Sequence, residues 1–320
     1  MSENFADLSF AFKEHLKVQN YSPASIDSYC YNLEKFFSYL TERSITDIRH
    51  VNRQLLKDYQ LDITKRYGAG TVSIMIRSVK RFFEHLEKAN QILINPAEYL
   101  REPKKESRLP RVVLSNDEAL KILDQPNLST FNGIRDRTIL EVFYSTGIRL
   151  EELRSLTIYD CDLKGGYLRV NKGKFAKDRV IPLGKHAVRF LKEYVTHVRP
   201  WHTKNNKAIR NLFVNHSGRI LSRPVIEILV RKYARAAGIK KKVTPHSFRH
   251  TFATELVKNG ADITAVQKML GHSRLSVTQL YAKVAGVEVK QTHAKHHPRE
   301  KDRAQREEAH VNIDGIGNRR

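Results

Sequence analysis

Two short stretches of this chain carry its most informative residues: TGIRLEEL at positions 146–153 and PHSFRH at positions 245–250. In the second stretch, Thr244 and Pro245 predict the start of a helix, because proline is favoured at the first helical position. His246 and Arg249 follow three residues apart, so one face of that helix presents both side chains. The pattern therefore predicts a helix that displays an imidazole and a guanidinium together.

Two further segments of the same region add lysines, a histidine and a tyrosine. Residues 166–170 and 179–183 read as two short strands, joined by a turn that contains Lys172, Lys174 and Lys177. Leu270-Gly-His272 is followed nine residues later by Tyr281. The region thus offers cations, imidazoles and one phenol.

Helical patterns surround this hairpin. Ser115 to Glu118 resembles a helix start, and the further helices are predicted at 134–145, 185–197, 224–237, 247–259, 263–270 and 277–281. We therefore expect a mainly helical unit with a small antiparallel β-sheet.

The first hundred residues predict four helices. The first covers about residues 4–18, and the second starts after Ser22 with Pro23 at its first position. The third covers about residues 51–66, and the fourth starts near Thr71 and carries an apolar stripe at helical spacing. This is the pattern of a small all-helical bundle.

Three cations share one face of the fourth helix: Arg77, Lys80 and Arg81. Their i, i+3, i+4 spacing suits a helix that lies along a phosphate backbone. A merely solvated face fits this helix equally well.

A polar, proline-containing segment separates the bundle from the mixed region. We predict a helical domain at 1–100, a linker at 101–112 and a second, mixed domain at 113–288. Residues 289–320 are rich in charge and poor in apolar side chains, which predicts a basic, largely mobile tail.

The chain has a formal net charge of +23, and most of the excess lies in its centre. Residues 104–286 carry 35 Lys and Arg against 15 Asp and Glu, whereas residues 1–103 carry 14 against 13. A surface this basic indicates a polyanionic partner such as nucleic acid. Charge alone does not distinguish DNA chemistry from passive binding.

The composition indicates neither a membrane protein nor a metalloprotein. No stretch approaches the ~18 consecutive apolar residues of a membrane span, and no basic-then-apolar signal segment opens the chain. Only Cys30 and Cys161 are present, outside any metal-binding spacing, so we expect no disulfide framework, metal or cofactor. We expect a cytoplasmic, nucleoid-associated protein.

The collected side chains suit phosphodiester chemistry. Arg149 and Arg249 can stabilise charge on the non-bridging oxygens of a five-coordinate phosphorus without a metal. A tyrosine phenol can form a covalent phosphate ester if a base, His246 or His272, eases loss of its proton. A lysine on the hairpin can protonate the leaving 5′ oxygen, and we choose Lys174.

The ordered series TGIRLEEL, a GK turn, HSFRH, LGH and a tyrosine resembles the tyrosine recombinase (phage integrase) family. The similarity covers roughly residues 5–298, including a helical N-terminal domain, and is greatest to Xer-type recombinases. The family's catalytic set then falls on six residues: Arg149, Lys174, His246, Arg249, His272 and Tyr281. Glu152 matches the acidic residue that supports the first arginine.

One departure concerns the hairpin, which has an additional residue before the lysine. Lys172 therefore competes with Lys174 as the general acid, although the spacing from Lys174 to Lys177 and Arg179 matches the family's pattern. Lys172 and Lys177 are expected to contact DNA phosphates.

The resemblance implies a site-specific recombinase that cuts and rejoins double-stranded DNA through a 3′-phosphotyrosyl intermediate and a four-way junction. Four protomers, identical or shared with a related recombinase, would assemble on two DNA sites. Dimer resolution, plasmid resolution and mobile-element integration all fit. The alternatives are a type IB topoisomerase-like enzyme and a non-catalytic DNA-binding protein.

Overall fold

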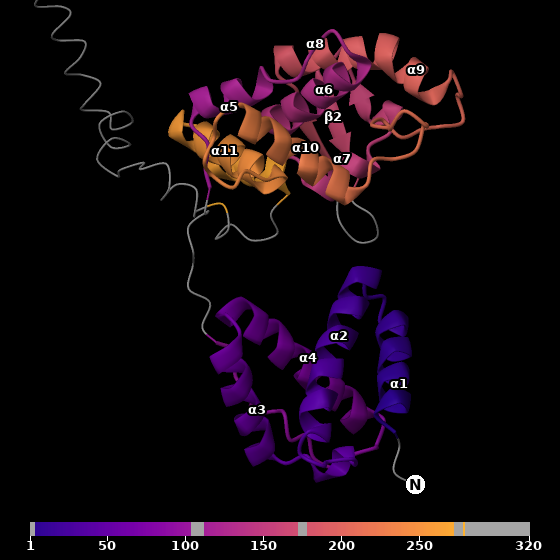
Figure 1. Cartoon of the computed structure of the whole chain (residues 1–320), viewed down its shortest axis with the longest axis vertical. Coiled ribbons are helices and arrows are strands. Elements are labelled where there is room, and N and C mark those ends of the chain that lie inside the picture. The colour runs from indigo at the N-terminus through magenta and orange to yellow at the C-terminus, as the bar shows by residue number, and fades with distance from the viewer. Residues whose placement is uncertain (1–3, 104–111, 172–177, 272–277, 279–320) are drawn as a thin grey trace, which may run out of the picture. The chain divides into compact units, whose positions relative to one another are not determined.

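The computed structural model divides the chain into two compact units, Met1–Ser107 and Arg108–Arg320, which are drawn in Figure 1. It describes residues 4–103, 112–171, 178–271 and 278. We call the two parts the first unit and the second unit. Among these described residues, no helix is both long and apolar enough to cross a membrane.

The first unit is a helical bundle, as predicted. Its elements are α1 (Phe5–Val18), α2 (Pro23–Thr41), a 3-10 turn η1 (Ile48–His50), α3 (Arg53–Arg66) and α4 (Ala69–Lys88). Side chains of Asn4, Ser22 and Asn52 accept hydrogen bonds from backbone N–H groups in the first turns of α1, α2 and α3. α4 packs against α1, α2 and α3, so it forms the centre of the bundle.

Aromatic side chains fill the core of the first unit. Phe82 of α4 is fully buried and makes edge-to-face contacts with Phe12 of α1 and Phe37 of α2. Phe36 packs in the same way against Phe83 and Tyr59. These ring contacts join all four helices.

The second unit contains helices and a small sheet. Its elements are α5 (Asn116–Leu123), α6 (Phe131–Thr146), α7 (Leu150–Ser155), η2 (Ile158–Asp160), β1 (Cys161–Asp162), β2 (Tyr167–Val170), β3 (Arg179–Pro182), α8 (Lys185–Glu193), η3 (Tyr194–Val198), α9 (Arg199–Thr203), α10 (Arg223–Ala236), α11 (Pro245–Lys258) and α12 (Ile263–Leu270). Helix α6 packs against α5, α8 and α11, as Figure 1 shows, and against β3. It is the central helix of this unit.

The three strands form an antiparallel sheet in the order β1-β2-β3. Leu168 of β2 pairs with Ile181 of β3, and both side chains are buried. The expected fold class, mainly helical with a small antiparallel sheet, is therefore confirmed.

Three short elements differ from the sequence predictions. The two-residue strand β1, the six-residue helix α7 and the five-residue helix α9 were not predicted, because none is long enough to show a period. The helix predicted at 185–197 ends earlier and continues as a π-helical turn, η3. The helix predicted at 277–281 lies outside the described residues except for Thr278.

Candidate active site

The C-terminal end of α12 is held by three arginines from three other elements. Arg179 of β3 donates to the carbonyl of Met269 at 2.6 Å, and Arg249 of α11 donates to the carbonyl of Leu270 at 2.7 Å. Arg149, just before α7, donates to the carbonyl of Gly271 at 3.3 Å. The last carbonyls of a helix have no partner within the helix and carry partial negative charge. The arginines supply the missing donors, so two of the sequence-predicted residues, Arg149 and Arg249, meet here.

Arg149 is positioned by a tight turn at the end of α6. Gly147 has a left-handed backbone (φ 59°), and a Cβ there would lie 2.6 Å from the ring of Phe252. Only glycine fits both conditions. The next residue, Ile148, is buried, and Arg149 follows with about a third of its side chain exposed (36%). The turn therefore brings a guanidinium to the surface of the core.

Arg249 is buried, with 3% of the residue exposed. Its helix begins at Pro245, and Thr244 and Ser247 bond to each other across the first turn. Besides Leu270, Arg249 donates to the carbonyl of Gly147 at 2.7 Å. One guanidinium therefore joins α11, the turn before Arg149 and the end of α12.

Glu152 lies between two of these arginines. Its carboxylate accepts hydrogen bonds from Arg149 (2.8 Å to the guanidinium, 2.9 Å to the backbone N–H) and from both terminal nitrogens of Arg179 (2.9 and 2.7 Å). Burial would raise the pKa of Glu152, but the bonds from Arg179 and Arg149 and the attraction of both guanidiniums lower it to about 2. The carboxylate is therefore ionised near pH 7.

His246 lies in a positive environment. Burial lowers its pKa, and the guanidiniums of Arg249, Arg223 and Arg149 lower it further, against the opposing effect of Glu227. Burial, His246 and Arg249 lower the pKa of His250, one helical turn on, to about 4. Both imidazoles are therefore neutral near pH 7, and a neutral imidazole can accept a proton.

The arrangement suits an anion that bears a developing negative charge. Arg149 and Arg179 pair with the one carboxylate of the cluster, Glu152, whereas Arg249 bonds to backbone carbonyls, so three guanidiniums and one carboxylate leave the cluster with a net positive charge. Guanidiniums are suited to the oxygens of phosphate, because their N–H groups form a planar fork. Among the described residues, no group of three His, Cys, Asp or Glu side chains is placed to hold a metal.

The other predicted site residues of the second unit lie outside the described residues. These are Lys172, Lys174, Lys177, His272 and Tyr281. Their chain neighbours belong to the cluster: Gly271 precedes His272 and accepts from Arg149, and Arg179 follows two residues after Lys177.

The three cations predicted on α4 have partners within the first unit. Arg77 pairs with Glu102, with Nε to Oε1 at 3.1 Å. Lys80 donates to the carbonyls of Glu98 and Leu100 (3.3 and 3.2 Å), so both side chains hold the chain that follows the bundle. Arg81 pairs with Glu84 on the helix surface, at 3.1 Å.

The sequence reasoning assigned no role to Arg179, although a signal was present. Side chains alternate across a strand, so Arg179 shares a face with Ile181, and that face is buried. A charged residue in phase with the apolar face needs a buried partner. The strand pattern alone therefore pointed to an internal ion pair.

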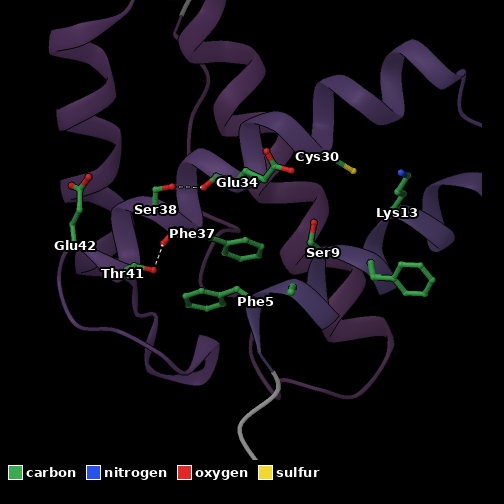
Figure 2. A pocket seen from close by; sticks show the side chains of 11 residues that line it. Phe5, Ser9, Lys13, Cys30, Glu34, Phe37, Ser38, Thr41 and Glu42 are labelled. Carbon is green, nitrogen blue, oxygen red and sulfur yellow. Dashed lines mark hydrogen bonds between the residues drawn. The ribbon is translucent and has the colours of Figure 1, made fainter.

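A separate groove lies between α1 and α2 of the first unit (Figure 2). The rings of Phe5 and Phe37 stack beside it at 4.6 Å, and Cys30 lines it as a free, half-buried thiol. The hydroxyls of Ser38 and Thr41 bond back to carbonyls of their own helix, as the dashed lines in Figure 2 show. The groove is therefore a gap between two packed helices, and none of the predicted catalytic residues lines it.

Comparisons with known proteins agree with this geometry. The sequence profile of the Phage integrase family matches residues 112–287, and that of the Phage integrase N-terminal SAM-like domain matches residues 11–90. Tyrosine recombinase XerD of Staphylococcus aureus is 37% identical over 279 residues, which cover 87% of this chain and 94% of that protein. XerD of Staphylococcus haemolyticus is 38% identical and covers 90% and 98%.

Solved structures share the fold. The XerH site-specific recombinase bound to palindromic difH substrate, a post-cleavage complex, superposes with a TM-score of 0.70 at 24% identity, covering 87% of this chain and 81% of that one. A lambda integrase dimer bound to a COC′ core site gives a TM-score of 0.67 at 17% identity, covering 89% and 98%. From its sequence matches and its arginine cluster, the chain belongs to the phage integrase family, the tyrosine recombinases.

Proposed function

We propose that this chain is a site-specific DNA recombinase that cuts and rejoins double-stranded DNA. The observation that carries the proposal is the meeting of Arg149 and Arg249 at the end of α12, directly before His272. Two guanidiniums at one place can hold the non-bridging oxygens of a single phosphate. Membership of the tyrosine recombinase family supplies the class of reaction.

In this proposal Tyr281 is the nucleophile. Its phenolic oxygen forms a bond to phosphorus while the bond to the 5′ oxygen breaks, which leaves a 3′-phosphotyrosyl enzyme and a 5′ hydroxyl. Arg149 and Arg249 stabilise the charge that develops on the phosphate oxygens. The 5′ hydroxyl of a partner strand then reverses the step, through a Holliday junction.

We assign the two proton transfers to a histidine, which accepts the proton of the tyrosine, and to a lysine between β2 and β3, which donates a proton to the leaving oxygen. His246 is neutral near pH 7 because its surroundings lower its pKa, so it can accept the proton of Tyr281, as can His272. Lys174 donates a proton to the leaving 5′ oxygen, with Lys172 as the alternative donor. Glu152 holds Arg149 in place.

We assign DNA binding to both units. Residues 1–100 would act as the DNA-binding domain, 113–288 as the catalytic domain and 289–320 as the basic tail, with 101–112 as the linker. Arg81 is about half exposed on α4 and can reach a phosphate directly. Arg77 and Lys80 would add positive charge to this surface while they keep their bonds within the first unit. Lys172 and Lys177 would contact phosphates next to the cleavage site.

Exchange between two DNA sites needs two pairs of active sites. We therefore propose a tetramer on paired sites, formed by this chain alone or with a related recombinase. We further propose that the chain acts in the cytoplasm, at the nucleoid, where it would meet its DNA substrate.

Mapping covalent protein–DNA junctions across sheared native genomic DNA tests this function. After denaturation, captured complexes should carry DNA 3′ ends that recur at one sequence. Tyr281→Phe should give none while its DNA affinity stays nearly unchanged, because the ring is kept and only the oxygen is lost. Absence of covalent complexes with the unmodified chain would refute the proposal, and junctions scattered over unrelated sequences would indicate a topoisomerase-like enzyme.

A further inference from the structure

We propose that Arg179 is a positioning residue for DNA cleavage, which it promotes by fixing Glu152 and the end of α12 against each other. The inference rests on the proposed recombinase function. Arg179 does not need to touch DNA. Its effect passes through Glu152 to Arg149, and through Met269 to the turn that leads into His272.

The first evidence is the burial of Arg179. Only 8% of its side chain is exposed, and the side chain of its partner Glu152 is 13% exposed. A buried guanidinium loses its hydration, so it is stable only when several acceptors replace the water. Arg179 has three such bonds: two to Glu152 and one to the carbonyl of Met269.

The second evidence is the geometry of these bonds. Both terminal nitrogens of Arg179 face the carboxylate, at 2.9 and 2.7 Å, and its Nε faces the Met269 carbonyl at 2.6 Å. The guanidinium is planar and rigid, so it sets the distance and direction between its two acceptors. A lysine in this place could keep the charge but could not hold both acceptors in one plane.

The third evidence is the position of Arg179 in the chain. It is the first residue of β3 and lies five residues after Lys174 in the chain, while Glu152 lies on α7 and Met269 on α12. One side chain therefore joins the three segments that carry Arg149, Lys174 and His272. Arg149 and Arg249 also bond to the end of α12, but among the described bonds only Arg179 adds β3 to this connection.

A purely structural role for Arg179 is the competing explanation, and the second unit offers a matched control. Arg199 is also buried, at 8% exposure for the whole residue, and donates to the carbonyls of Ile209 and Asn211. Among the described residues, its hydrogen bonds go to neither Glu152 nor α12. Loss of Arg199 should thus cost stability without altering the cleavage step.

The test compares Arg179→Met, Arg179→Lys and Arg199→Met in the full chain. The substrate is a nicked duplex that carries the mapped cleavage site, and the readouts are single-turnover covalent attachment between pH 5 and 8, DNA affinity and thermal unfolding. We expect both Arg179 variants to attach at least ~10-fold more slowly with unchanged DNA affinity, because Arg179 acts through Glu152 and the end of α12 and not by touching DNA. Arg199→Met should attach at the unmodified rate when corrected for its folded fraction.

The pH profile separates positioning from stability. Arg149 and Arg179 are the charged groups that face Glu152, and together they keep its pKa near 2. Without Arg179, burial still raises the pKa of Glu152 while one of the two cations is lost, so the pKa rises and more of the carboxylate is protonated than in the unmodified chain as the pH falls from 8 towards 5. Arg179→Met should lose about a further 10-fold of its rate across this range, whereas Arg179→Lys and Arg199→Met should follow the unmodified profile.

A double variant covers the possibility that Arg179→Met does not fold. Arg179→Met with Glu152→Gln leaves no unpaired buried carboxylate, so this double variant should fold. It should still attach DNA slowly, because Arg179 is absent. It should not show the additional pH dependence, because glutamine does not titrate. The inference is overturned if folded Arg179→Lys, or the double variant, attaches DNA at the unmodified rate. It is also overturned if the Arg179 variants slow only as far as Arg199→Met does. Failure of the proposed function looks different, because the unmodified chain would then attach no DNA.

Discussion

The two units bury different kinds of side chain. Among the described residues, the buried polar side chains of the first unit are all neutral, namely Asn32, Ser73 and Ser78. The second unit buries arginines and carboxylates as well, including Arg135, Asp136, Glu141, Arg179, Arg199 and Arg249. The apolar side chains in the core of the first unit are stabilised by packing, which requires only that their shapes fit together. Each buried charge of the second unit needs a partner at a defined distance, which fixes the segments that carry the chemistry.

Not every buried charge belongs to the candidate site. Arg135 pairs with Asp136, which also accepts from Tyr233, and among the described residues this group bonds to neither Glu152 nor α12. Arg179 and Arg249, by contrast, hold the end of α12. The difference suggests that burial of charge is a general device of the second unit, and that the catalytic role depends on which carbonyls the arginines hold.

Removing a core ring should have the largest effect, and on the first unit alone. Phe82→Ala removes a fully buried ring that contacts Phe12 and Phe37, so we expect a loss of about 3–5 kcal/mol of stability. Hydrogen exchange followed by mass spectrometry should show faster exchange in α1–α4 and unchanged exchange in α6 and α11. Phe10→Ala, at an exposed position of α1, is the control and should change stability by no more than about 0.5 kcal/mol. Faster exchange in α6 and α11 would contradict the independence of the two cores.

Changing a charged residue of the site should affect the reaction instead. Arg249→Lys keeps the positive charge. A lysine has no planar guanidinium, so it cannot donate to the carbonyls of Gly147 and Leu270 and also bind a phosphate with the same geometry. We expect single-turnover attachment to slow on the order of 10²- to 10³-fold, the scale of a lost oxyanion donor. Arg199→Lys makes the same change at a buried arginine remote from these carbonyls and should attach normally. Near-normal attachment by Arg249→Lys would remove the arginine from the mechanism.

The hairpin gives the third comparison, with an expected loss on the order of 10²-fold. Lys174→Ala should attach ordinary DNA slowly but recover on a bridging 5′-phosphorothiolate, because the departing thiolate is stable without a proton. Lys172→Ala should show no such recovery. Rescue of Lys172→Ala in its place would transfer the role to that residue, and rescue of neither would exclude a general acid on this hairpin.

The predictable parts of the fold are those with a long period or a clear cap. The bounds of α12 match the predicted residues 263–270, and Ser115 caps α5 as its sequence indicates. Helix α6 starts at Phe131, three residues before the predicted start. Its N-cap is Thr130, whose side chain accepts from the N–H of Gly133, and this first turn has no apolar stripe that would have revealed it. Local signals therefore determine most helices.

The contacts of the site could not be predicted in the same way. Arg149 and Arg249 were identified from their motifs, but their meeting at the α12 carbonyls joins residues about a hundred positions apart, which no local pattern encodes. The same holds for Arg77 and Lys80, whose helical spacing was plain while their partners after the bundle were not. Tertiary contacts decide which cations remain exposed.

Identification of the amino acid that becomes joined to DNA tests the central claim most directly. The covalent complex on the mapped site is digested with a protease and a nuclease, and the peptide that retains a nucleotide is sequenced by mass spectrometry. The account predicts a phosphotyrosyl linkage at Tyr281 to a DNA 3′ end. A nucleotide on any other residue, or a linkage to a 5′ end, would contradict it.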